Sequence, residues 1–128
     1  MTSFFRRLFG SSKKLDSTKF PNVVVGKIID IESHPNADRL QLATVDIGKR
    51  LRIVCGAPNI AIGQFVPVAL VGASLANGLV IQQAAIRGVD SEGMLCAADE
   101  LGIGSDHSGI MIFESARVGD PIDNYLNK

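Results

Sequence analysis

Short apolar runs rich in Val and Ile alternate along this chain with clusters of Gly, Pro, Asn and Asp. The runs cover residues 23–31, 40–47, 51–55, 65–71, 79–86, 93–97 and 109–113. Runs of this length, bounded by turn-forming residues, are typical of β-strands. No long amphipathic helix lies between them. The pattern therefore predicts a small closed or partly closed β-barrel, and a five-stranded OB-type barrel fits the chain length.

Local signals refine this expectation. Gly48 and Lys49 predict a tight hairpin between the second and third runs. The apolar alternation within residues 40–47 changes phase, as at a β-bulge. Pro67 interrupts the run 65–71, and because proline cannot donate a backbone hydrogen bond, we expect an edge strand or a bulge there. Residues 99–101 predict a short helical turn.

Charge is unevenly distributed, although the formal net charge is zero. Residues 1–19 carry five basic groups and one acidic group, residues 20–87 carry six and four, and residues 88–128 carry two and eight. Such a balance disfavours indiscriminate binding of nucleic acid, which depends on the number of phosphates neutralised. Any nucleic-acid site on this chain must therefore be a local patch.

Residues 1–21 are predicted to form a basic amphipathic extension and linker that precedes a barrel domain at 22–126. On a helical wheel the aromatic and aliphatic side chains of the extension oppose its basic ones. Contact of residues 1–16 with a membrane or another anionic surface is one interpretation, and a targeting segment is another. An extension that is poorly ordered, or packed on the barrel or on a second copy, is equally compatible.

No convincing catalytic constellation is present. The soft metal ligands are two Cys and two His residues, Cys55, Cys96, His34 and His107, and no two of them are spaced as a metal-binding pair. Glycines 102 and 104 lack the following Lys of a phosphate-binding loop. We expect no enzyme activity, no metal and no cofactor, and the two cysteines indicate a reducing, cytoplasmic location.

Five ordered motifs resemble the tRNA-binding domain found near the N-terminus of the bacterial phenylalanine-tRNA ligase beta subunit. The same module occurs in free-standing tRNA-binding proteins and in some methionine-tRNA ligases. The motifs are His34 to Leu40 (HPNADRL), Val54 to Asn59 (VCGAPN), Val66 to Leu70 (VPVAL), Arg87 to Cys96 (RGVDSEGMLC) and Glu100 to Gly102 (ELG). The resemblance extends from about Val23 to about Tyr125.

The resemblance implies an OB barrel that recognises the shape and backbone of tRNA. Carried over by position, the expected contacts are Arg39, Ser91 and Met94, with Asn36 and Arg87 beside them. An Arg can fork onto a phosphate, a Ser can bond a phosphate or ribose hydroxyl, and a Met can pack on a sugar or base.

Each of these residues also has a structural interpretation. Asn36 could cap its loop, Ser91 could close its turn through a backbone bond, Met94 could belong to the core, and Arg87 could end a surface strand. His34 is expected to orient the loop rather than bind a ligand.

Two functions remain open at this point. The first is a non-catalytic tRNA-binding module, free-standing or acting in trans with an aminoacyl-tRNA ligase. The alternative is a protein-interaction or chaperone-like OB module, with residues 1–16 as a membrane tether. The C-terminal segment that pairs dimeric relatives is not evident, so both a monomer and a homodimer are compatible with the sequence.

Overall fold

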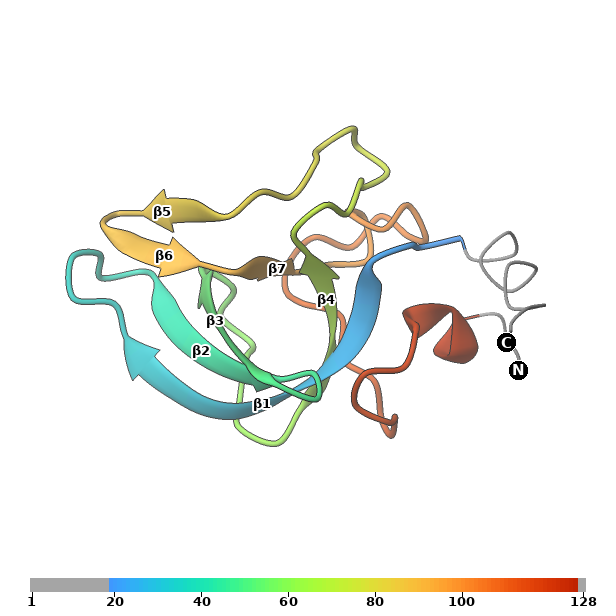
Figure 1. Cartoon of the computed structure of the whole chain (residues 1–128), viewed down its shortest axis with the longest axis horizontal. Helices are drawn as coiled ribbons and strands as arrows, with labels where there is room; N and C mark the ends of the chain where they lie inside the picture. Colours follow the sequence, from blue (N-terminus) through green and yellow to red (C-terminus); the bar gives the residue numbers. More distant parts are fainter. Residues whose placement is uncertain (1–18, 127–128) are drawn as a thin grey trace, which may run out of the picture.

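The computed structural model describes residues 19–126, which fold into seven β-strands and one short 3-10 helix (Figure 1). The strands are β1 (Val23–Ser33), β2 (Gln41–Asp46), β3 (Arg50–Cys55), β4 (Phe65–Leu70), β5 (Ala84–Ile86), β6 (Val89–Ser91) and β7 (Gly93–Leu95). The 3-10 helix η1 covers Ile122–Tyr125. An all-β fold with short helical turns, as the sequence predicts, is confirmed.

Five strands form one antiparallel sheet in the order β3-β2-β1-β4-β7, and β5 and β6 form a separate hairpin. The sheet curls until its two outer strands, β3 and β7, approach each other. Beside this junction the backbone N–H of Glu92 donates to the carbonyl of Arg52 at 2.9 Å. The result is the nearly closed five-stranded barrel that defines the OB class.

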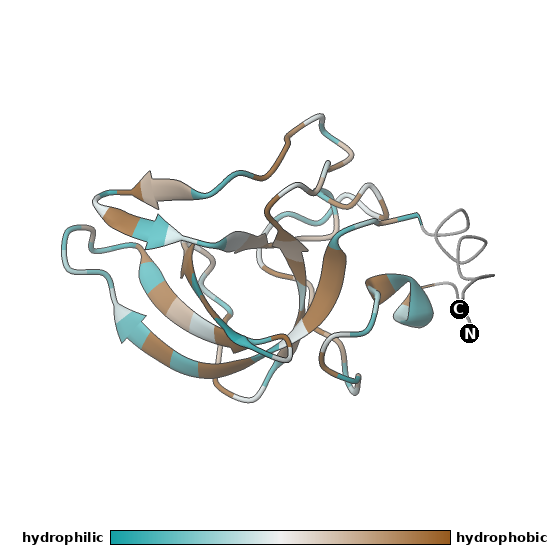
Figure 2. Ribbon diagram, in the orientation of Figure 1, coloured by the Kyte–Doolittle hydropathy of each residue, from teal (hydrophilic) through white to brown (hydrophobic). Residues whose placement is uncertain are grey.

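Two apolar clusters lie on opposite faces of the sheet, one inside the barrel and one outside it, and β1 contributes to both. Val23 and Val25 pack in one cluster, and Ile28 packs in the other. Gly26 lies between Val25 and Ile28 in sequence, and an added Cβ there would come within 2.5 Å of Val45 Cγ1. A side chain at residue 26 would therefore collide with a stiff β-branched neighbour. Figure 2 shows the resulting apolar bands along the strands.

The expectation of an edge or bulge at Pro67 is wrong. β4 lies between β1 and β7, and its register with β1 is continuous through Val25 and Pro67. Val25 directs its own N–H and C=O away from β4, to Asp120 and Gly119. On the β7 side the Pro67 carbonyl accepts the N–H of Cys96. The missing N–H of Pro67 therefore removes no bond of the β1–β4 ladder.

The predicted hairpin between the second and third runs is confirmed. It occupies residues 47–49, and Gly48 has a φ of 107°, which a glycine adopts without strain. The bulge expected within residues 40–47 lies in the neighbouring strand β1 and not in β2. The register of β1 with β2 shifts between Ile28 and Asp30, whereas β2 pairs with β3 without interruption.

Two predicted strands are shorter or absent. Of residues 79–86, only the last three form a strand. Residues 109–113 form no strand: Phe113 makes only an isolated bridge to Phe65, and the side chain of Asn59 takes both backbone bonds of Ile110. Asn59 Nδ2 donates to the Ile110 carbonyl at 3.0 Å, and Asn59 Oδ1 accepts the Ile110 N–H at 2.9 Å. Residues 98–102 form hydrogen-bonded turns, where the sequence predicted a helical turn.

The predictions for residues 1–18 lie outside the described residues. Within residues 19–126, no helix is long and apolar enough to cross a membrane. The first described residue, Lys19, donates its backbone N–H to the Asp123 carboxylate at 2.7 Å. The described part of the chain therefore begins beside the 3-10 helix, as Figure 1 shows.

Candidate nucleic-acid interface

The loop that joins β1 to β2 lies against the turn of the β5–β6 hairpin, although about fifty residues separate them in sequence (Figure 1). We call loop 34–40 and hairpin 84–91 together the rim, and the five-stranded sheet the wall. In OB barrels, loops in these two connections flank the strand face that binds oligonucleotides. The rim therefore occupies the place where this fold carries its ligand.

His34 holds the two parts of the rim together. Its ring is buried, with 6% of its surface exposed. The ring Nε2 lies 2.9 Å from the carbonyl oxygen of Ile86, and the backbone N–H of Asn36 donates to Nδ1 at 2.9 Å. Since a carbonyl can only accept, Nε2 carries the proton and Nδ1 is the acceptor. The prediction that His34 orients the loop is confirmed.

Asn36 adds a second bond across the rim. Its side-chain Nδ2 donates to the backbone carbonyl of Arg87 at 3.0 Å. Arg87 has a φ of 54° and Gly88 a φ of 88°, so the hairpin turns through two left-handed residues. A bulky, flexible residue at position 87 is uncommon in this conformation. The guanidinium of Arg87 is presented from the tip of this turn and is exposed.

Ser91 connects the rim to the wall. Its side chain is 3% exposed, its hydroxyl accepts the N–H of Val54, and the same hydroxyl donates to the carbonyl of Gly93, both at 3.0 Å. The bond to Gly93 is the turn-closing bond expected as the structural interpretation of this residue. The single hydroxyl proton is already used, which leaves acceptor capacity only.

Arg39 and Met94 occupy different surroundings. Arg39 is exposed on the loop that His34 and Asn36 anchor. Met94 lies in β7, is partly buried, and packs against the apolar cluster that contains Val23. The structure thus exposes Arg39, Asn36 and Arg87 on the rim, whereas Ser91 is buried where the rim meets the wall and Met94 is half-buried in the wall.

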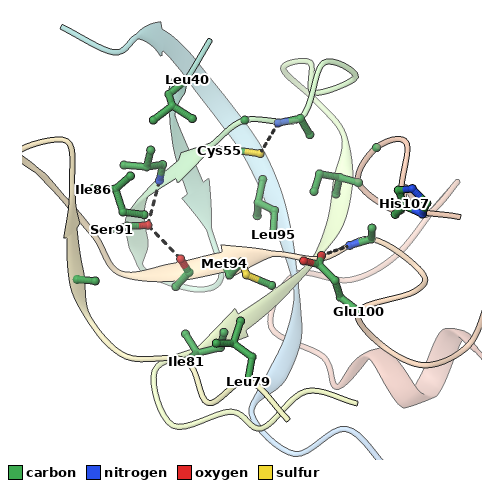
Figure 3. Close-up of a pocket in the computed structure, with 18 of the residues that line it drawn as sticks. Leu40, Cys55, Leu79, Ile81, Ile86, Ser91, Met94, Leu95, Glu100 and His107 are labelled. Carbon is green, nitrogen blue, oxygen red and sulfur yellow. Dashed lines mark hydrogen bonds between the residues drawn. The ribbon is translucent and has the colours of Figure 1, made fainter. Parts of the chain in front are cut away.

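An apolar groove of about 930 Å³ opens beside the rim (Figure 3). Leu40 and Cys55 lie on one side, Leu79 and Ile81 on the other, Met94 and Leu95 between them, Ile86 and Ser91 at one end, and Glu100 and His107 at the other. The sequence did not predict this groove. The only signal for it was the apolar run at residues 79–81, which also fits a buried strand.

The two ends of the groove differ in charge. Beyond the apolar middle, Glu100 lies at the end far from the rim, and its sequence neighbour Asp99 also lines the groove. The carboxylate of Glu100 accepts the backbone N–H of Ala97 at 2.8 Å. Negative charge at this end disfavours phosphate, so a nucleic-acid backbone is better accommodated at the rim.

Both thiols are buried, and neither is suited to nucleophilic chemistry. Burial, reinforced by the nearby Glu100 carboxylate, raises the pKa of Cys96 from 9.0 to about 12. Burial is also the main cause that raises the pKa of Cys55. A neutral thiol is a poor nucleophile and a poor metal ligand. Among residues 19–126, no group of three or more His, Cys, Asp or Glu side chains is placed to hold a metal ion.

The chain is a barrel of the OB class with exposed hydrogen-bonding groups on its rim. Comparison with known families shows to which family of such barrels it belongs. The family model described as "Putative tRNA binding domain" matches residues 23–121. The chain belongs to this family of domains.

Relatives in known proteins agree with this assignment. The chain is 53% identical over 100 residues to the phenylalanine-tRNA ligase beta subunit of Nitratidesulfovibrio vulgaris, and 53% identical over 110 residues to that of Aromatoleum aromaticum. These matches cover 76% and 84% of the chain but only 12% and 14% of the two ligase subunits. The chain therefore corresponds to a small part of each subunit.

Solved structures show the same fold at low sequence identity. A MetRS-related protein from Pyrococcus horikoshii matches with a TM-score of 0.58 and 19% identity, over 89% of this chain and 96% of that one. An RNA ligase from Naegleria gruberi matches with a TM-score of 0.58 and 15% identity, over 82% of this chain and 33% of that one. The barrel is thus shared among proteins of different organisation.

Proposed function

We propose that this domain is a non-catalytic module that binds tRNA by its shape and backbone, with the rim as the contact surface. The single observation that carries the proposal is the locked rim. His34 and Asn36 fasten the loop of Arg39 to the turn of Arg87, so two exposed guanidinium groups are held on adjoining loops. Membership of the tRNA-binding family supports the choice of ligand.

The proposed roles follow from exposure and bonding. Arg39 and Arg87 donate to phosphates, and each can form two parallel bonds. Asn36 retains the capacity to bond a ribose hydroxyl, because only one of its amide protons is used in the bond to Arg87. Met94 packs on a sugar or base that enters the groove. Ser91 shapes the surface, and any contact it makes with RNA is as an acceptor.

The charge of the rim predicts that RNA is recognised by a few positioned side chains rather than by a large net positive charge. Two carboxylates, of Asp38 and Asp90, accompany the two arginines of the rim. The contact surface is therefore close to neutral, and binding releases few counterions. We expect a shallow salt dependence, corresponding to about two phosphates.

The test compares folded tRNA with an unstructured RNA of the same length at two salt concentrations. We expect tighter binding of tRNA by the native chain, and weaker binding with a flatter salt slope for Arg39→Glu and Arg87→Glu. Arg117→Glu is the matched control. Its side chain is also exposed, but it lies next to Gly119 and Asp120, which bond to the opposite end of β1 from loop 34–40.

Equal affinity for both RNAs, or equal effects of all three charge reversals, would refute shape recognition at the rim. Undetectable binding of tRNA would instead favour a protein-interaction module. The apolar groove, with its acidic end, is the observation that supports this second function.

The wider role proposed for the module is delivery or retention of tRNA, either alone or in trans with an aminoacyl-tRNA ligase. The relatives that are 53% identical over the matched residues are ligase subunits, and this suggests the ligase as partner. Co-purification of the chain with a ligase after nuclease treatment separates the two cases. A complex that survives the nuclease supports direct action in trans, and one that disappears supports contact through tRNA alone.

A further inference from the structure

The apolar groove beside the rim has an open apolar border. Leu79 and Val80 are 47% and 48% exposed, and Ile86 is exposed at the end next to the rim. A water-exposed surface formed by several large aliphatic side chains around a hollow is unfavourable unless another apolar group covers it. The size of the groove, about 930 Å³, is sufficient for several large side chains.

The acidic end of the groove selects the charge of whatever covers it. Glu100 lies at this end and Asp99 precedes it in the groove lining. Asp106 is adjacent, since its carbonyl accepts the backbone N–H of Asp99 at 3.2 Å. Hydrogen bonds from Ser108 to Asp106 lower the pKa of that carboxyl and keep it ionised at neutral pH. An occupant with apolar side chains next to basic ones therefore complements both the groove and its end.

The described part of the chain begins near this acidic end. Lys19 and Phe20 line a second, smaller pocket together with Ala76, Leu101 and Glu100. Glu100 thus borders both the small pocket and the groove. Lys19, the first described residue, therefore lies one side chain away from the groove lining.

That segment has the required composition. The chain before Lys19 carries the apolar side chains Phe4, Phe5, Leu8 and Phe9, the basic side chains Arg6, Arg7, Lys13 and Lys14, and no acidic residue before Asp16. We propose that residues 4–9 of the chain dock in its own groove, with their Phe side chains against Met94 and Leu79 and their basic groups toward the acidic end.

The length of chain permits this docking. Roughly ten residues separate Phe9 from Lys19, and an extended chain of that length spans up to ~33 Å. A tethered segment also acts at an effective concentration of the order of mM, so that a weak contact is enough to fill the groove. A second copy, a membrane or a foreign protein lacks this advantage. The docked segment would compete with an RNA sugar or base for Met94, but the docking itself is tested without RNA.

The native full-length chain offers an internal probe. Its three methionines are Met1, Met94 and Met111. Met94 lines the groove, whereas Met111 packs on the core and is absent from the groove lining. Met94 already packs on a cluster that contains Phe113. With 13C-methyl methionine, we therefore expect additional nuclear Overhauser contacts from the Met94 methyl to the rings of Phe4 and Phe5, and these contacts disappear in the double variant Phe4→Ser, Phe5→Ser. The Met94 resonance shifts in this variant, and the Met111 resonance does not.

Two further variants complete the test. Ser11→Ala with Ser12→Ala changes the same segment without altering its Phe groups, and it leaves the Met94 signal unchanged. Leu79→Ser changes an exposed groove residue, so the fold is retained while the same contacts are lost. A Met94 resonance that is identical in the native chain and the Phe variant overturns the proposal. Contacts seen between labelled and unlabelled chains overturn it also, because they assign the occupant to a second copy.

Discussion

The wall and the rim are stabilised by different interactions. Four of the five strands of the wall have six or more residues, and their inward side chains, such as Ile28 and Ile53, are fully buried. The rim contains three-residue strands, and all of β5 is exposed. Its geometry depends on a few polar side chains, chiefly His34, Asn36 and Ser91. Changes in the wall should therefore lower the stability of the fold, whereas changes in the rim should first alter how loop 34–40 and hairpin 84–91 are positioned.

The largest expected effect is on the wall. Ile53→Ala removes a fully buried side chain from the apolar cluster around β2 and β3 and leaves a cavity. We expect the free energy of unfolding to fall by about 2–5 kcal/mol, measured by urea denaturation. Ile62→Ala, at a site that is 63% exposed, is the control and should cost much less. Similar losses for the two variants would contradict the assigned core.

Ser91→Ala tests the junction between the wall and the rim. It leaves the N–H of Val54 and the carbonyl of Gly93 without their partner. Because the site is buried, we expect a loss of about 1–3 kcal/mol in the free energy of unfolding. Ser115→Ala changes an exposed serine and should have little effect. An unaltered stability for Ser91→Ala would mean that the hydroxyl does not connect the two regions.

The buried thiol of Cys96, which follows β7, makes the stability of the fold sensitive to alkaline pH. Because the pKa of Cys96 is raised from 9.0 to about 12 in the folded chain, the unfolded chain loses this proton first. Stability should therefore fall as pH rises through this window, by up to about 1.4 kcal/mol per pH unit for this group. Cys96→Ala should have a shallower decline than the native chain in urea denaturation above pH 9.0. Parallel declines would exclude a contribution from this thiol.

The smallest effect on stability is expected at the rim. His34→Phe preserves a buried ring but loses the bonds to the Ile86 carbonyl and the Asn36 N–H. Both groups belong to exposed residues and can bond to water instead, so we expect a loss of about 1 kcal/mol or less.

His34→Phe should have a larger effect on the position of loop 34–40 than on stability. Amide hydrogen exchange at Asn36 should accelerate, and tRNA affinity should fall more than stability does. His107→Phe, at an exposed histidine, is the control for the ring substitution. A rim that exchanges as slowly as in the native chain would show that His34 is not its anchor.

The sequence determined most of the wall. Short runs rich in Val and Ile between turn residues, the glycine at residue 48 and the ordered motifs predicted a small all-β barrel, because apolar runs of strand length form the buried strands of such a fold. It also indicated that His34 orients its loop rather than binds a ligand, since no Cys or His is spaced with it as a metal-binding pair.

The tertiary structure decided what depends on partners far away in sequence. Pro67 fits inside the sheet because the β1–β4 pair at Val25 needs no proline N–H. Within residues 109–113, Ile110 bonds to the side chain of Asn59 rather than to a neighbouring strand. The rim and the groove arise in the same way, since bonds across about fifty residues bring Asn36 to Arg87. Local patterns encode which residues are buried, but only the folded chain determines which polar groups meet, because each such bond requires two distant segments to be placed at once.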